Sequence, residues 1–210
     1  MATSKGTRIG IWIIAITMTV GTLGSFAVMV LANGNQQADA SRLQQLMTEF
    51  QNEQTAQSDE LAAKYYKTFS TYADTPSIFN ADSVSKLEIK DLVVGSGEVI
   101  KDDTQYSAYY IGWNPKGKVF DQSIEGDTLK APIEGGNLIE GWNQGVKGMK
   151  IGGIRQLTIP AAQAYGEKGS GEDIPANTPI KFIVMAIPHV SAVQPSEELV
   201  KIYGQQQQQQ

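Results

Sequence analysis

A stretch of 24 residues without a charge, IGIWIIAITMTVGTLGSFAVMVLA at residues 9–32, limits what this chain can fold into more than any other feature. As an α-helix rising about 1.5 Å per residue it would reach about 36 Å, enough to cross a hydrocarbon core of about 30 Å. Lys5 and Arg8 precede it and the next charge is Asp39, so the positive-inside bias predicts a cytoplasmic N-terminus at residues 1–8. We therefore expect a single-pass membrane protein. The alternative is a signal peptide cleaved near Ala32, which would leave a secreted protein, although the run exceeds the usual signal length.

The next segment, residues 33–83, is polar and rich in Gln and Ala, and it carries two short apolar stripes at helical spacing. The stripes are Leu43, Leu46, Met47 and Phe50, then Leu61, Tyr65, Phe69 and Tyr72. A helical stalk that holds the following domain away from the membrane is the favoured interpretation. A partner-binding or dimerising pair of helices is the alternative, but two short stripes do not sustain a heptad pattern.

From residue 84 the pattern changes to strands, which we expect at residues 87–89, 106–113, 153–159 and 180–187. Between them, LIEGWNQGV at residues 138–146 has the pattern of one short helix. An antiparallel sheet crossed by a single helix is an α+β arrangement, and we place this domain at residues 84–190. The tail, residues 191–210, ends in six glutamines and is predicted to be disordered.

Composition excludes several classes of function. The chain has 17 Lys and Arg against 22 Asp and Glu, and no region is basic enough to neutralise a row of phosphates, so no nucleic-acid partner is expected. With no cysteine, disulfides, thiol chemistry and zinc ribbons are excluded. The single histidine, His189, follows Pro188 beyond the last predicted strand, where a solvated side chain is expected. We predict neither a metal nor a cofactor.

A series of short motifs indicates the fold and the chemistry. In order they are YIG at residues 110–112, KVFD at 118–121, LIEGW at 138–142, GVKGM at 145–149, LTIP at 157–160, AYG at 164–166, IP at 174–175 and IKF at 180–182. In this order and spacing the chain resembles the FKBP-type peptidyl-prolyl cis–trans isomerases over residues 87–187, about half its length. The resemblance implies an antiparallel sheet of five or six strands curled around one short α-helix, with a proline pocket between helix and sheet.

The resemblance also implies residue roles. Trp142 would form the floor under the proline ring, and the walls would be Tyr110, Phe120, Ile139, Tyr165 and Phe182. The backbone N–H of Ile139 and the hydroxyl of Tyr165 would donate hydrogen bonds to substrate carbonyls. Asp121 would orient the site and place a negative charge near the twisting amide.

Further residues would border the pocket. Leu138 and Ile174 would line its rim, and Leu129 and Ala131 stand where the family often has aromatic residues, which would thin one wall. Asp173, beside Ile174, occupies a position that is often apolar. Macrolides that inhibit the family would therefore bind weakly here.

Physical chemistry agrees with this resemblance. Rotation about an X–Pro bond crosses a barrier of about 20 kcal/mol, and a twisted amide is less dipolar than a planar one, so an apolar slot favours it. The expected function is a membrane-anchored isomerase acting on proline-containing polypeptides outside the cytoplasm. Two alternatives remain at this point: a non-catalytic chaperone or binding module with the same fold, and a structural domain of an envelope complex.

Overall fold

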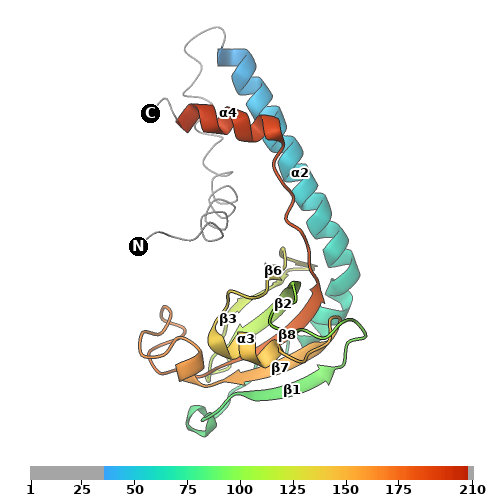
Figure 1. Cartoon of the computed structure of the whole chain (residues 1–210). Helices are drawn as coiled ribbons and strands as arrows, with labels where there is room; N and C mark the ends of the chain where they lie inside the picture. The colour runs from blue at the N-terminus through green and yellow to red at the C-terminus, as the bar shows by residue number, and fades with distance from the viewer. Residues whose placement is uncertain (1–35, 208–210) are drawn as a thin grey trace. The chain divides into compact units, whose positions relative to one another are not determined.

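The structure, a computed structural model, describes residues 36–207 and divides into two compact units (Figure 1). The larger unit is Thr55–Ala192, and the smaller one combines residues 36–54 with residues 193–207. No helix within residues 36–207 is both long and apolar enough to cross a membrane. The predicted anchor at residues 9–32 and the N-terminus at residues 1–8 lie outside the described residues, so both stay predictions.

The larger unit is built on a six-stranded antiparallel sheet, which confirms the expected α+β architecture. The strands are β1 (Glu88–Val93), β2 (Tyr106–Trp113), β3 (Val119–Gln122), β6 (Ile133–Glu134), β7 (Ile154–Ile159) and β8 (Ile180–Pro188). They follow the order β1-β7-β8-β2-β3, with β6 paired to β2. A separate hairpin joins β4 (Ile124–Glu125) to β5 (Thr128–Leu129), and short 3-10 turns lie at Ser70–Tyr72, Ala81–Ser83 and Ala161–Gln163.

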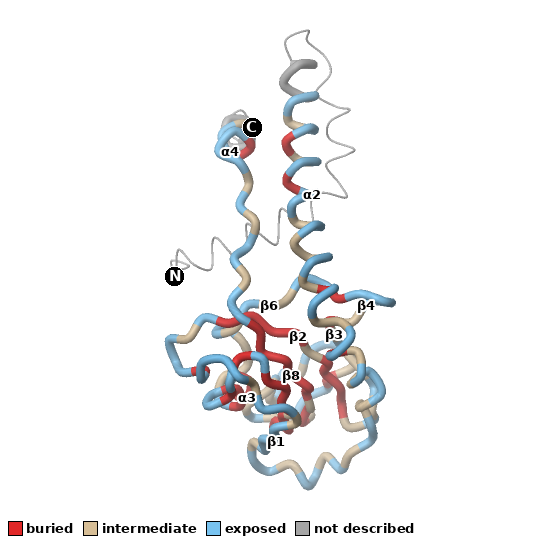
Figure 2. The backbone as a smooth tube through the Cα atoms, turned by 90° about the vertical axis from the view of Figure 1, so that its right-hand side faces the viewer, coloured by how far each residue is buried: buried red, intermediate tan, exposed pale blue. Residues whose placement is uncertain are grey.

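The two central strands, β2 and β8, are buried over most of their length (Figure 2). Their side chains contribute to the packing on both faces of the sheet. Because side chains alternate along a strand, β2 directs Ala108 and Tyr110 to one face and Tyr109 and Ile111 to the other. In β8, Phe182 and Ile183 divide in the same way. The sheet therefore separates two apolar cores.

Helix α3 (Glu140–Val146) packs on the first of these faces (Figure 1). Two glycines of α3 allow the helix to approach β7 closely. A Cβ added at Gly141 would come within 2.3 Å of Ile159 Cγ2, and one at Gly145 within 2.7 Å of Leu157 Cδ2. The glycines that weaken this helix in isolation therefore let it lie close against β7.

The buried guanidinium of Arg155, on β7, fixes the end of α3. Its Nη1 donates to Gly145 O at 2.8 Å, in the last turn of the helix, and at 3.1 Å to the carbonyl of Lys147, the residue after the helix. Its Nε and Nη2 donate to both oxygens of Asp91 on β1, at 2.6 and 3.1 Å. This bidentate contact ties the helix to two strands.

Helix α2 (Gln36–Phe69) is continuous through both predicted stripes, because residues 51–58 contain neither Gly nor Pro to interrupt it. Its second part belongs to the larger unit and covers the other face of the sheet. Phe69 is fully buried there, and the rings of Phe69 and Tyr65 lie 6.1 and 6.0 Å from that of Tyr109. The compact unit therefore begins at Thr55, whereas the sequence placed the domain boundary at residue 84.

The smaller unit pairs the first part of α2 with helix α4 (Glu197–Gln207). The sequence predicted disorder for the tail, and the structure differs. Leu199 of α4 is buried against Leu46 and Phe50 of α2. Ser196 precedes α4, and its Oγ accepts a hydrogen bond from the N–H of Leu199 at 3.2 Å, which starts the helix.

Candidate active site

A cavity of about 700 Å³ opens between α3, the first face of the sheet and the loop of residues 164–175. Its described lining is Tyr110, Phe120, Asp121, Ile133, Asn137, Leu138, Ile139, Trp142, Tyr165, Ser170, Gly171, Glu172, Asp173, Ile174 and Phe182. Nine of the ten site residues predicted from the sequence are in this set. The structure thus brings together residues that are far apart in the chain.

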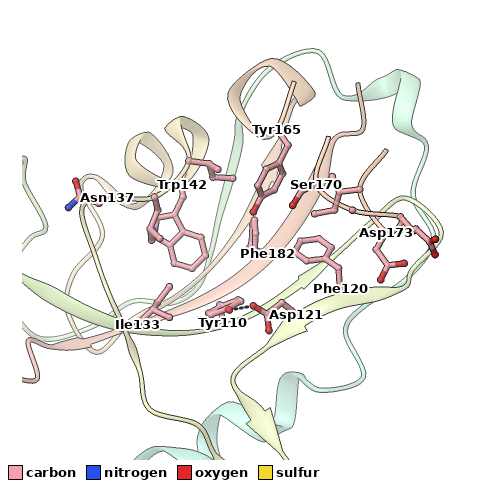
Figure 3. Close-up of a pocket in the computed structure, with 15 residues that line it drawn as sticks. Tyr110, Phe120, Asp121, Ile133, Asn137, Trp142, Tyr165, Ser170, Asp173 and Phe182 are labelled. Atoms are coloured by element: carbon pink, nitrogen blue, oxygen red, sulfur yellow. Dashed lines mark hydrogen bonds between the residues drawn. The ribbon is translucent and has the colours of Figure 1, made fainter. Parts of the chain in front are cut away.

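The apolar wall is a cluster of aromatic rings around Phe182 (Figure 3). The ring of Phe182 lies 5.1 Å from that of Trp142, 5.6 Å from that of Phe120 and 6.1 Å from that of Tyr110, all edge-to-face. Gly112 makes room for this cluster, because a Cβ there would approach Phe182 Cε1 to 2.5 Å and Phe120 Cε2 to 2.7 Å. Edge-to-face rings fix the shape of an apolar slot.

Trp142, the predicted floor, lines the cavity, and its side chain is almost wholly buried. Its indole Nε1–H donates a hydrogen bond to the hydroxyl of Tyr106 at 3.2 Å, and burial raises the pKa of that hydroxyl. Because Tyr106 already satisfies its one polar group, Trp142 offers an apolar ring surface to a ligand.

A carboxylate, Asp121, lies at the edge of the aromatic wall. The hydroxyl of Tyr110 donates a short hydrogen bond to Asp121 Oδ2, drawn as a dashed line in Figure 3. The backbone N–H of Gln122 donates to Asp121 Oδ1 at 2.8 Å, and Lys130 Nζ lies 3.9 Å from the same oxygen. Burial and the neighbouring carboxylate both raise the pKa of Tyr110, so its hydroxyl stays protonated and holds Asp121 in place.

Tyr165 and Ile139, the two residues predicted to donate hydrogen bonds to the substrate, both line the cavity. Burial and the charge of Asp121 raise the pKa of Tyr165, so its hydroxyl keeps its proton at neutral pH. Ile139 directly precedes α3, and its carbonyl accepts from the N–H groups of Trp142 and Asn143 at 3.0 and 3.1 Å. Its own N–H has no recorded acceptor within residues 36–207 and is available to a ligand.

The rim is a loop with its own internal hydrogen bonds. Ser170 N–H donates to Ile174 O at 2.7 Å, and the buried Asn114 Nδ2 donates to Asp173 O at 2.8 Å. Gly169 has a φ of 65° and no room for a Cβ, which would meet Ile174 O at 2.4 Å. This position therefore requires glycine.

The prediction for Leu129 was wrong. Its side chain does not line the cavity but is buried, 2% exposed, in the core on the opposite face of the sheet. The hairpin of β4 and β5 turns the side chain of Leu129 inward, and spacing along the chain does not reveal such a turn. The exposed His189 lies beyond β8, away from the cavity, and the part of the chain described here holds no cluster of potential metal ligands.

Six lining residues were not predicted as site residues: Ile133, Asn137, Ser170, Gly171, Glu172 and Asp173. Most of them lie in loops, where no periodicity marks which side chain faces inward. The sequence did mark the loop that contains the last four, because polar residues stand beside Ile174 where the family pattern is often apolar. That departure could have identified them as lining residues.

Comparisons with known proteins place this chain in one family. Residues 96–187 match the family model described as FKBP-type peptidyl-prolyl cis-trans isomerase. A probable FK506-binding protein of Corynebacterium glutamicum is 41% identical over 100 residues, which are 47% of this chain and 82% of that protein. FK506-binding protein 4 of Rhizopus delemar is 42% identical over 98 residues, 47% of this chain but only 26% of that protein. A solved structure of a peptidyl-prolyl cis-trans isomerase from Pseudomonas syringae is 29% identical over 61% of this chain and 92% of that chain, with a TM-score of 0.43.

Proposed function

We propose that this chain, which belongs to the FKBP-type peptidyl-prolyl cis–trans isomerase family, catalyses rotation about X–Pro bonds of polypeptides in the cavity between α3 and the sheet. The observation that carries this proposal is the combination found there. An aromatic slot lies beside one carboxylate and two hydrogen-bond donors, the Ile139 N–H and the Tyr165 hydroxyl, which have no recorded acceptor within residues 36–207.

The slot can lower the barrier without covalent chemistry. An X–Pro bond rotates slowly because amide resonance is lost at the midpoint, a barrier of about 20 kcal/mol. The twisted amide has a smaller dipole than the planar amide, so moving it from water into an apolar cavity stabilises it relative to either planar isomer. Each 1.36 kcal/mol of such differential stabilisation raises the rate about tenfold.

The residues of the slot then have distinct tasks. Trp142 and Phe182 take the proline ring, which orients the bond that rotates. The Ile139 N–H and the Tyr165 hydroxyl donate to carbonyls on either side and hold the flanking chain. Asp121, fixed by Tyr110, presents its charge to the twisting amide.

We also propose a membrane anchor at residues 9–32, which would place the domain outside the cytoplasm, where secreted and envelope proteins would be its clients. The support is the length and hydrophobicity of that run and the position of Lys5 and Arg8. Protease accessibility of the domain in intact cells tests this placement, since cleavage is expected from outside only if the domain is exported.

FK506-type macrolides are proposed as a further ligand of the slot. The relatives from Corynebacterium and Rhizopus carry FK506-binding names, and the aromatic slot is of a kind that takes an apolar ring system. We expect weak binding, because Glu172 and Asp173 make part of the cavity wall charged.

The test of the proposed activity is cis–trans exchange of short X–Pro peptides, measured by NMR exchange spectroscopy with the purified chain in mild detergent. We expect acceleration by the natural chain and a large loss in Phe120→Ala, which removes one ring of the slot. Lys67→Ala, an exposed position of α2 that is absent from the cavity lining, serves as the matched control. A folded chain that accelerates no peptide would leave a non-catalytic binding module as the function.

A further inference from the structure

The cavity wall is charged in one sense only. Among the described residues that line it, three are carboxylates: Asp121, Glu172 and Asp173. No described lining residue is Lys or Arg. Aromatic and aliphatic side chains make up most of the remaining lining. A polypeptide that places its proline ring on Trp142 therefore lays its neighbouring residues beside acidic groups.

One of these carboxylates already holds an ammonium group. Lys118 Nζ, which comes from the turn between β2 and β3, lies 2.5 Å from Asp173 Oδ1. The Lys118 side chain is 62% exposed, so the pair lies at the surface. Asn114 holds the loop at this point, because its Nδ2 bonds Asp173 O and its Oδ1 accepts from the N–H groups of Lys116 and Lys118. The position of Asp173 is thus suited to a cationic side chain.

The other two carboxylates, Asp121 and Glu172, differ in their hydrogen-bond and ion-pair partners. Asp121 accepts hydrogen bonds from Tyr110 and Gln122 and has Lys130 at 3.9 Å. Glu172 is exposed on the rim, and residues 36–207 contain no ion pair with it. Of the three, Glu172 is the carboxylate that has no cation within ion-pair distance among the described residues.

We propose that this cavity selects proline segments that carry a cationic side chain close to the proline. Glu172 is the residue that attracts the cation, and Lys118 limits the selectivity because it occupies Asp173. This inference rests on the proposed isomerase function and adds a substrate class to it. The contact lies at an exposed rim, where an ion pair contributes modestly, so we expect about a two- to fivefold preference.

The experiment compares peptides that differ only in charge. In a series of short peptides with one central X–Pro bond, Lys replaces norleucine at one position at a time, from two residues before the proline to two after it. Norleucine is uncharged and similar in length, so the ratio of kcat/KM for the two peptides isolates the charge. With the full chain in nonionic detergent, we expect at least one position with a ratio of about two to five, falling as salt is added.

Variants assign the preference to residues. Glu172→Gln should bring the ratio close to one, and Lys118→Met should raise it, because Asp173 is then available to the substrate. Glu167→Gln removes a carboxylate from the same loop at an exposed position that does not line the cavity, and it should leave the ratio and the activity unchanged. A loosened loop would affect both peptides alike and would not move the ratio.

The outcomes separate the two proposals. If norleucine peptides are accelerated and the ratio is one or less at every position, the charge selectivity is wrong while the isomerase function stands. The same holds if Glu167→Gln lowers the ratio as much as Glu172→Gln does. If neither peptide of any pair is accelerated, the isomerase function is overturned, and the inference with it.

Discussion

The two faces of the sheet are made from the same strands but have opposite characters. On β2, Tyr109 points to one face and Tyr110 to the other. Tyr109 is fully buried among side chains of α2 and the sheet, and no partner for its hydroxyl is recorded among the described residues. Tyr110 lines an open cavity, and its hydroxyl is bonded to Asp121.

The helices on each side account for the difference. The second part of α2 covers its face with large side chains such as Phe69 and Tyr65, which fill the space above Tyr109. On the other face α3 has only seven residues, and two of those that meet β7 are glycines, so it covers less of the sheet. One face is thereby closed as a core, and the other is left open as a site.

The largest effect is expected from Trp142→Ala, which damages the open face. Truncation of a buried aromatic residue costs about 3–5 kcal/mol of unfolding free energy, and here it also leaves the hydroxyl of Tyr106 unpaired. Activity should be lost even in the fraction that remains folded. Urea denaturation and peptide exchange measure the two effects, and normal activity in a folded variant would exclude the slot as the site.

Phe69→Ala should be similarly destabilising, about 3–5 kcal/mol by urea denaturation, because it opens a cavity in the closed core. In contrast to Trp142→Ala, the kcat/KM of the folded fraction should equal that of the natural chain. If activity falls by more than the unfolded fraction explains, the closed core influences the site, and the two faces do not act independently.

Asp121→Asn should lower kcat/KM by about tenfold, the scale of one lost charge-assisted hydrogen bond, while unfolding free energy changes by less than about 1 kcal/mol. The stability effect is small because half of this side chain is exposed. Exchange kinetics together with thermal melts show whether Asp121 acts in the site or only supports the fold. Unfolding of the variant with unchanged activity per folded molecule would make Asp121 a structural residue.

Tyr109→Phe should have the smallest effect, a gain of up to about 1 kcal/mol, because it removes a buried hydroxyl without a recorded partner. Burial raises the pKa of Tyr109 to about 12, so the natural chain keeps this proton where the unfolded chain loses it. Ionisation of this group therefore costs the folded chain nothing below about pH 10, and it lowers stability progressively between about pH 10 and pH 12. Denaturation at pH 9 and pH 11 should show a smaller alkaline loss in the variant, and an equal loss would contradict this.

Much of the open face could be predicted from the sequence, because its residues occur in short motifs whose order reflects the fold. The closed face was harder. Phe69 and Tyr65 had helical spacing, but spacing alone does not say whether such a stripe covers the same domain, another copy or a partner. Leu129 and the loop at Glu172 depend on turns, where local geometry and not periodicity decides the direction of a side chain.

The central claim, that only the open face binds proline segments, has a direct test in the two described tryptophans. The indole Nε1–H of Trp142 lies under the cavity and bonds Tyr106, whereas that of Trp113 is buried in the closed core and bonds Ser77 O at 3.2 Å. A titration of the ¹⁵N-labelled chain with a proline peptide reports on both. We predict that the Trp142 indole resonance shifts and saturates while the Trp113 resonance stays in place. A shift of Trp113 alone, or of neither at saturating peptide, would contradict the account.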